Sequence, residues 1–171
     1  SMTGSAGQLC TNPGIAVVPE GAAGDALVAA TAEALAAVAP QVMLTAGMAD
    51  AYRAGKARLD ASNAVRPVHI TGSSGRAVGP NLYEVSSAAF LSDHGPLSLV
   101  VRVPSAEAML ELARGFAGQL TATLHMDAGD ADMARQLMPV LERKAGRILV
   151  NGYPTGVEVC DAMVHGGPYP A

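Results

Sequence analysis

The chain has 171 residues, half of them hydrophobic, and its formal net charge is −4. That length fits a single domain with a sizeable core. The acidic balance, the aromatic content of only 4% and the lack of tryptophan argue against a nucleic-acid partner, which needs a basic surface and stacking side chains. No apolar run approaches the ~18 residues of a membrane span, and neither a signal-peptide pattern nor a disulfide framework is seen. We therefore expect a cytoplasmic protein without a membrane partner.

Short apolar stretches bounded by glycine and proline predict strands, and apolar residues spaced three or four apart predict helices between them. The expected strands cover residues 15–18, 66–71, 82–86, 97–103, 120–126 and 148–151. The expected helices cover residues 25–38, 44–61, 105–118 and 130–145, with Pro139 as a point where the last one bends or splits. This alternation predicts an α/β fold with a mainly parallel, helix-flanked sheet.

Cys10 is the most informative residue for function. It stands between small and polar neighbours, in the run Gly7-Gln8-Leu9-Cys10-Thr11, shortly before the first expected strand. Small neighbours leave a thiol approachable, and the thiolate is the form that attacks an electrophilic carbon. A buried structural cysteine is the alternative. We expect Cys10 near one edge of the sheet, in a helix or a turn.

Several segments resemble the aldehyde dehydrogenase superfamily, in the order in which the family carries them. The run from Gly7 to Thr11 is similar to the segment that holds the family's nucleophile. Residues 147–159 resemble a strand and the substrate loop of one branch, the α-ketoglutaric semialdehyde dehydrogenases, and residues 162–171 resemble the segment after that loop. Residues 82–86 resemble the middle strand of the same branch.

The resemblance implies that residues 1–171 are the catalytic domain of such an enzyme, isolated from its cofactor-binding domain. No expected strand is followed by the Gly-x-Gly-x-x-Gly run of a dinucleotide site. The complete enzyme would use NAD or NADP to oxidise a small aldehyde, with α-ketoglutaric semialdehyde as the best guess, and would form a homo-oligomer. The segment alone would bind no cofactor and would be inactive.

By the same resemblance, Cys10 is the catalytic nucleophile, which forms a thiohemiacetal and then a thioester with the substrate. The substrate wall would be the loop formed by Asn151, Tyr153, Pro154, Thr155, Gly156 and Val157. Open α/β sheets bind ligands where such loops leave a strand's carboxyl end, although an ordinary tight turn is the alternative. The family's glutamate base and oxyanion amide fall outside this chain, and neither Glu20 nor Glu84 is assigned the role of base.

One stretch departs from the family's pattern. Where the family has Glu-x-Phe-Gly-Pro, whose glutamate holds the nicotinamide ribose, this chain has Ser92-Asp93-His94-Gly95-Pro96. Only Gly95 and Pro96 match, and the stretch is several residues short. A second interpretation therefore stays open, namely a non-catalytic α/β module that serves in assembly or binding.

The remaining polar groups have simpler explanations than a metal or substrate site. Asp127, Asp130 and Asp132 depart from the EF-hand spacing and suit helix capping. The four histidines show no metal-ligand spacing, so no metal is expected. The arginines that flank strands are interpreted as surface charges: Arg66, Arg76 and Arg147.

Overall fold

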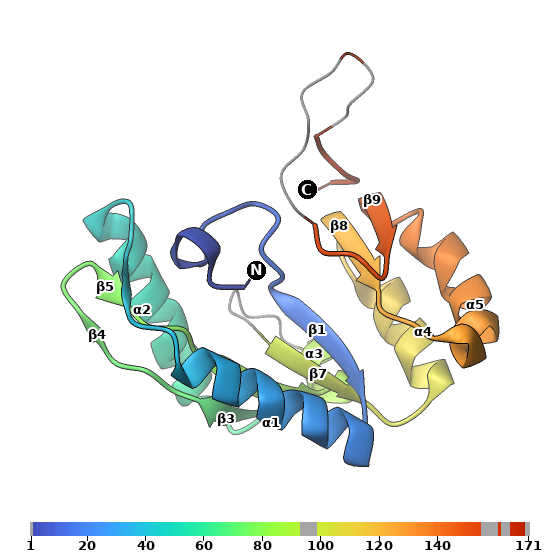
Figure 1. Cartoon of the computed structure of the whole chain (residues 1–171), viewed down its shortest axis with the longest axis horizontal. Helices are drawn as coiled ribbons and strands as arrows, with labels where there is room; N and C mark the ends of the chain where they lie inside the picture. Colours follow the sequence, from blue (N-terminus) through green and yellow to red (C-terminus); the bar gives the residue numbers. More distant parts are fainter. Residues whose placement is uncertain (1, 93–98, 155–160, 162–164, 170–171) are drawn as a thin grey trace. The chain divides into compact units, whose positions relative to one another are not determined.

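The computed structural model describes residues 2–92, 99–154, 161 and 165–169. Two compact units make up the chain, Ser1–Ser105 and Ala106–Ala171 (Figure 1). Each expected strand and helix has a counterpart among the described residues, and the fold class is confirmed as α/β with mainly parallel strand pairing. Within the described part of the chain, no helix combines the length and the apolar character that crossing a membrane requires.

The first unit is built on a four-stranded sheet in the order β1-β7-β6-β3. β1 (Ile15–Pro19), β7 (Leu99–Val103) and β6 (Leu82–Ser86) run parallel, whereas β3 (Val65–His69) is antiparallel to β6. Every residue of β7 is buried, as expected for a central strand covered on both faces. β1 is an edge strand of this sheet, so the preceding segment, which contains Cys10, joins the sheet at its edge.

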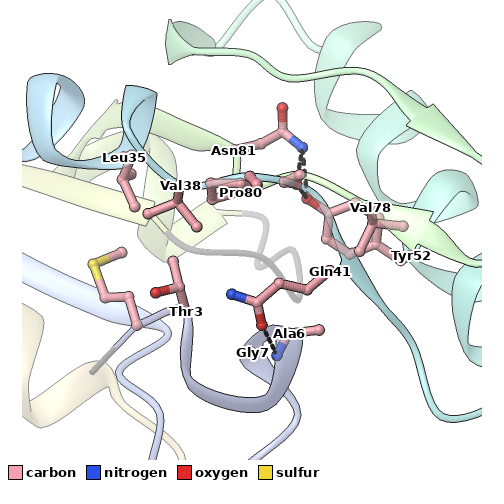
Figure 2. A pocket seen from close by; sticks show the side chains of 13 residues that line it. Thr3, Ala6, Gly7, Leu35, Val38, Gln41, Tyr52, Val78, Pro80 and Asn81 are labelled. Carbon is pink, nitrogen blue, oxygen red and sulfur yellow. Dashed lines mark hydrogen bonds between the residues drawn. The ribbon is translucent and has the colours of Figure 1, made fainter.

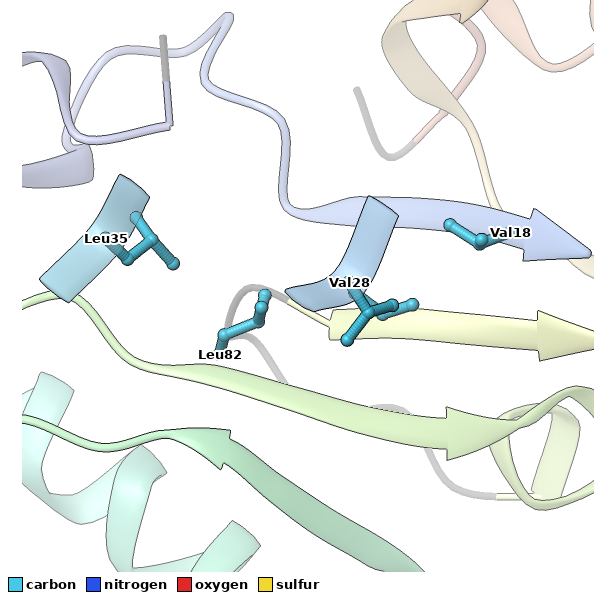
Figure 3. Packing of buried hydrophobic residues seen from close by; sticks show 5 residues of the cluster. Val18, Val28, Leu35 and Leu82 are labelled. Carbon is cyan, nitrogen blue, oxygen red and sulfur yellow. The ribbon is translucent and has the colours of Figure 1, made fainter. Parts of the chain in front are cut away.

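α1 (Ala22–Ala36) covers one face of this sheet. Its Val28 and Leu35 pack with Val18 of β1 and Leu82 of β6 in a buried apolar cluster (Figure 3). Burial of each such side chain stabilises the fold by about 1.5–3 kcal/mol. This cluster fixes α1 against the strand that directly follows the Cys10 segment.

A smaller antiparallel sheet, in the order β2-β5-β4, was not expected from the sequence. Its strands are β2 (Gln41–Val42), β5 (Ala77–Val78) and β4 (Ser73–Ser74). Two residues are too few to show the alternation by which a strand is recognised. The other elements of this unit are η1 (Gly4–Gly7), α2 (Ala46–Asp60) and α3 (Ser87–Ser92).

α2 is joined to the main sheet by a buried tyrosine. Tyr83 of β6 is fully buried and donates its hydroxyl to Asp60 Oδ1 at 2.7 Å. Burial, followed by this hydrogen bond, raises the pKa of Tyr83 above its usual range. Hydrogen bonds from Lys56, at 2.6 Å, and from Tyr83 lower the pKa of the Asp60 carboxyl. The charged carboxylate therefore holds the end of α2 to β6.

β7 also carries a buried charged residue, Arg102. The Leu/Val-rich run around it did not indicate that this residue would be buried. Its Nη2 lies 2.6 Å from Asp25 Oδ1 and its Nε lies 3.7 Å from Glu84 Oε1, and Glu84 also pairs with Arg66. Nη1 of Arg102 is buried without a hydrogen-bond partner among the described residues. The guanidinium lies close to Gly24, where an added Cβ would come within 3.0 Å of Nη1.

The second unit pairs β8 (Gln119–Leu124) with β9 (Ala145–Val150) in parallel. α4 (Ala106–Gly115) and α5 (Ala131–Leu141) form a buried apolar cluster through Ala113, Leu137 and Leu141. α5 continues through Pro139 but ends four residues before the expected end, because β9 already begins at residue 145. At the start of η2 (Ala128–Asp130), which precedes α5, Asp127 and Asp130 form a capping box, and this confirms the capping interpretation for these two residues.

Candidate active site

Cys10 is exposed and lies in a turn between η1 and β1, as expected. The backbone before it is unusual, because Ser5, Ala6 and Gly7 have φ values of 50°, 56° and 75°. This left-handed region favours glycine and costs other residues roughly 1–2 kcal/mol each. Such strain persists only where surrounding contacts hold it, and it is found preferentially at functional sites.

Side-chain amides hold this segment, here called the Cys10 loop (residues 4–12). Within the loop, Asn12 Nδ2 donates to the Gly4 carbonyl and Gln8 Nε2 donates to the Ser5 carbonyl, both at 2.8 Å. Two further bonds join the loop to the β2 region. Gln41 Oε1 accepts the Ala6 N–H at 2.8 Å, and Gln8 Oε1 accepts the Leu44 N–H at 3.0 Å. The loop is thus tied to a second segment more than 30 residues away in sequence.

A small cavity of about 60 Å³ lies beside this loop (Figure 2). Ala6 and Gly7 line it together with Gln41, Tyr52 and Asn81. A cavity needs roughly 10–15 Å³ of space to hold one water molecule. This cavity therefore has room for a few waters but not for a dinucleotide. Cys10 is not among the residues that line it.

The polar wall of the cavity is a hydrogen-bonded pair. Tyr52 donates its hydroxyl to the Gly79 carbonyl at 2.9 Å and accepts from Asn81 Nδ2 at 2.5 Å. Asn81 Oδ1 accepts the Thr71 N–H at 2.7 Å. Burial raises the pKa of Tyr52, although the hydrogen bond from Asn81 acts against it. This phenol therefore stays neutral at physiological pH and serves as a fixed dipole rather than as a base.

The expected substrate loop begins in the second unit, where β9 ends beside the end of β8. Asn151 has a left-handed φ of 51°, and its N–H binds the Leu124 carbonyl at 2.9 Å. Its side chain clamps Met126, because Oδ1 accepts the Met126 N–H at 2.8 Å and Nδ2 donates to the Met126 carbonyl at 2.9 Å. Both polar atoms of the amide are therefore used to hold the backbone at the carboxyl ends of the two strands.

Beyond this clamp, the side chains are accessible. Tyr153 is 67% exposed, and its ring lies 5.2 Å from the ring of His125, centroid to centroid. Tyr153 and Pro154 are the last described residues before a gap, and Thr155, Gly156 and Val157 lie outside the described residues, as does Cys160. Of the expected site residues, Cys10 belongs to the first unit and the described part of the loop belongs to the second.

Replacement of Asn151 tests the clamp. Asn151→Ala is expected to lower the free energy of unfolding by about 2–4 kcal/mol, because two hydrogen bonds of ~1 kcal/mol each are lost and alanine disfavours the left-handed backbone. Asn151→Gly loses the same bonds but tolerates this backbone, so its loss should be smaller. Urea unfolding of both variants measures the difference. An equal loss in the two variants would show that the left-handed backbone contributes nothing.

The stretch that departs from the family's pattern and the candidate metal ligands are described only in part. Ser92, which the resemblance aligns with the family's ribose-binding glutamate, has a hydroxyl that donates to the Ala89 carbonyl at 2.7 Å. Residues 93–96 of the departing stretch lie outside the described part of the chain. In the described ranges, no three side chains of the histidine, cysteine or acidic type gather as metal ligands.

The arginines differ from one another in their surroundings. Arg66 and Arg76 are exposed, in agreement with their interpretation as surface charges, and Arg76 Nη1 donates to the Leu44 carbonyl at 3.0 Å. The interpretation is wrong for Arg147, which is half-buried and whose Nε is buried without a partner among the described residues. Position beside a strand could not distinguish these cases, because burial depends on what packs over the strand.

Sequence reasoning missed the roles of Gln41, Tyr52 and Asn81. Their contacts join residues 27 to 35 positions apart in sequence. Such pairs leave no periodic pattern in a single sequence. Gln41, the polar residue of the two-residue strand β2, was the nearest available signal.

The fold is that of aldehyde dehydrogenases. Solved structures with the same fold include Delta-pyrroline-5-carboxylate dehydrogenase from Mycobacterium tuberculosis, with a TM-score of 0.73 and 20% identity over 99% of this chain and 35% of that one. They also include succinic semialdehyde dehydrogenase from Streptococcus pyogenes, with a TM-score of 0.71 and 18% identity over 97% of this chain and 39% of that one. At these identities the likeness concerns the fold alone.

In sequence, the chain is similar to α-ketoglutaric semialdehyde dehydrogenases, which confirms the resemblance inferred from its motifs. It is 49% identical to alpha-ketoglutaric semialdehyde dehydrogenase 2 of Azospirillum brasilense, over 100% of this chain and 34% of that protein. It is 37% identical to alpha-ketoglutaric semialdehyde dehydrogenase of Acinetobacter baylyi, over 96% of this chain and 33% of that protein. The chain thus spans about a third of the length of these curated relatives. No family model matches it.

Proposed function

We propose that this chain is the nucleophile-bearing segment of an NAD- or NADP-dependent aldehyde dehydrogenase that oxidises α-ketoglutaric semialdehyde to the acid. The observation that carries the proposal is the 49% identity over the whole chain with a protein named for that reaction. The exposed position of Cys10 in a strained, hydrogen-bonded turn agrees with a nucleophile. The assembly of the complete enzyme as a homo-oligomer is part of the same proposal.

In the proposed chemistry, the Cys10 thiolate attacks the aldehyde carbon and forms a thiohemiacetal. Loss of hydride from that carbon gives a thioester, which water then hydrolyses to release the acid and regenerate the thiol. NAD or NADP is the proposed hydride acceptor. The substrate wall is the loop that begins at Asn151, which holds the backbone, and continues through Tyr153, Pro154, Thr155, Gly156 and Val157.

A chimera tests the proposed substrate. In the Azospirillum relative, the segment that matches this chain is replaced by this chain, and NAD(P)H formation is compared between α-ketoglutaric semialdehyde and a simple aldehyde such as propanal. We expect activity that prefers the semialdehyde and disappears in Cys10→Ser. A chimera that binds cofactor but oxidises neither aldehyde would favour the alternative of a non-catalytic module.

The nucleophilic role of Cys10 makes a separate prediction for the chain itself. Reactivity of a cysteine depends on its access and on the fraction of thiolate. We expect iodoacetamide to label Cys10 of the folded chain faster than Cys160, as measured by mass spectrometry of the labelled peptides. The urea-unfolded chain serves as the control, in which the two rates should become similar. Preferential labelling of Cys160 in the folded chain would contradict the proposed role.

A further inference from the structure

The Cys10 loop is tied to the β2 region by a side chain that takes no part in the proposed chemistry. Gln41 Oε1 accepts the Ala6 N–H at 2.8 Å across 35 positions of sequence (Figure 2). Gln41 is itself held by the smaller sheet, because it is paired with Val78 of β5. The acceptor therefore belongs to a braced strand, whereas the donor belongs to the strained backbone four residues before Cys10.

The bond matters because it holds the part of the loop that borders the cavity. Ala6 is half-buried and packs against the cluster of Met43, Ala49 and Val78. On the side of the cavity, however, Ala6 and Gly7 face a space of about 60 Å³ rather than packed side chains. Ser5 and Ala6 also occupy a backbone region that non-glycine residues leave when they are not held there. A directed hydrogen bond thus supplies what packing does not.

From this geometry we infer that Gln41 is a positioning residue for Cys10, and the inference rests on the proposed role of Cys10 as the nucleophile. By accepting the Ala6 N–H, Gln41 fixes the left-handed turn from which the chain continues to the thiol. Gln8 strengthens the same connection by a bond in which the loop is the acceptor, because its Oε1 accepts the Leu44 N–H at 3.0 Å. Loss of the Gln41 acceptor releases the turn and lets the thiol leave its fixed position.

Two substitutions separate the hydrogen bond from the shape of the side chain. Gln41→Met keeps the length and removes the acceptor, whereas Gln41→Glu keeps an acceptor oxygen at the same place. Gln136→Met is the matched control, because Gln136 is an exposed glutamine on α5 in the other unit. The free energy of unfolding in urea is measured for each variant, so that any change at Cys10 can be compared with the change in stability.

The main readout is the rate of Cys10 alkylation by iodoacetamide, measured as a full pH profile in the folded chain. Each limiting rate is divided by that of a synthetic peptide of residues 5–14, which carries the same cysteine without the fold. Hydrogen exchange of the Ala6 and Gly7 amides, followed by NMR, reports on the loop independently of thiol chemistry.

We expect the alkylation rate of wild-type Cys10 to differ from that of the peptide. Gln41→Met should bring the rate about tenfold closer to the peptide rate, because misplacement by about 1 Å can change rates by 10²-fold. The same variant should lose protection of the Ala6 amide. Gln41→Glu should stay within about twofold of wild type, as should Gln136→Met.

Two results would overturn the inference. In one, Gln41→Met keeps the wild-type alkylation ratio. In the other, Gln41→Glu loses it. A wild-type ratio of one would overturn the proposed nucleophile instead. In that case the Ala6 amide decides about Gln41 separately, and unchanged protection in Gln41→Met would refute its hold on the loop.

Discussion

The 171-residue chain by itself is expected to form no detectable NAD(P)H from any aldehyde. Hydride transfer requires an acceptor held close to the thiohemiacetal carbon, and such positioning can lower the barrier by about 7–11 kcal/mol. Ser92, which the resemblance aligns with the family's ribose-binding glutamate, has a hydroxyl that already donates to the Ala89 carbonyl. The thioester would also lack a general base, which typically contributes about 10²–10⁴-fold.

The measurement is the absorbance of NAD(P)H at saturating cofactor, with α-ketoglutaric semialdehyde and with propanal. The complete Azospirillum relative provides the positive control under the same conditions. A cooperative urea transition of the chain shows that the sample is folded, so that inactivity is not the result of unfolding. Sustained NAD(P)H formation that disappears in Cys10→Ser would refute the expectation and would place a cofactor site within this chain.

Replacement of Arg102 by alanine is expected to lower the free energy of unfolding by about 3–5 kcal/mol. The side chain of Arg102 is 8% exposed, and that of its partner Glu84 is 17% exposed. Removing one member of a buried ion pair leaves the other charge without full compensation, which is more damaging than removing both. Glu84 would keep its ion pair with Arg66. Asp25, whose side chain is 72% exposed, would be solvated instead of paired.

A comparison of two variants by urea unfolding separates charge from packing. Arg102→Met fills most of the volume, and the double variant Arg102→Met, Glu84→Gln also removes the carboxylate charge, so the double variant should be more stable than Arg102→Met alone. Arg135→Ala is the control, because Arg135 pairs with Asp132 at an exposed site and its loss should change stability by less than about 0.5 kcal/mol. Equal losses at Arg102 and Arg135 would contradict the importance of burial.

The alternation of strands and helices could be predicted because it rests on local patterns. The continuous Leu/Val run of β7 and the spacing of apolar residues in the alanine-rich helix α1 are visible within the sequence itself. The capping pair of Asp127 and Asp130 was equally visible, because its members lie three residues apart. Element boundaries were less certain, as α5 shows, because they depend on where the next strand begins to pair.

The candidate site could be predicted only in part. Cys10 and the loop at Asn151 were located through resemblance, since an isolated cysteine or a tight turn has no specific chemical signature. The ties between the Cys10 loop and Gln41 depend on the sheet β2-β5-β4, whose two-residue strands carry no pattern. The pairing of Arg102 with Asp25 joins residues 77 positions apart. Both arise only when the chain has folded.

The pairing of β1 with β7 has a consequence for synthesis of the chain. Ile15 lies opposite Leu99, 84 positions later (99 minus 15), and the structure pairs β1 with no other strand among the described residues. At about 5–20 residues per second, the ribosome needs roughly 4 to 17 s to supply that partner. During this interval β1 has no strand to pair with, so the Cys10 loop that leads into β1 has no sheet edge to join. The arrangement around Cys10 is therefore completed only after β7 has been synthesised.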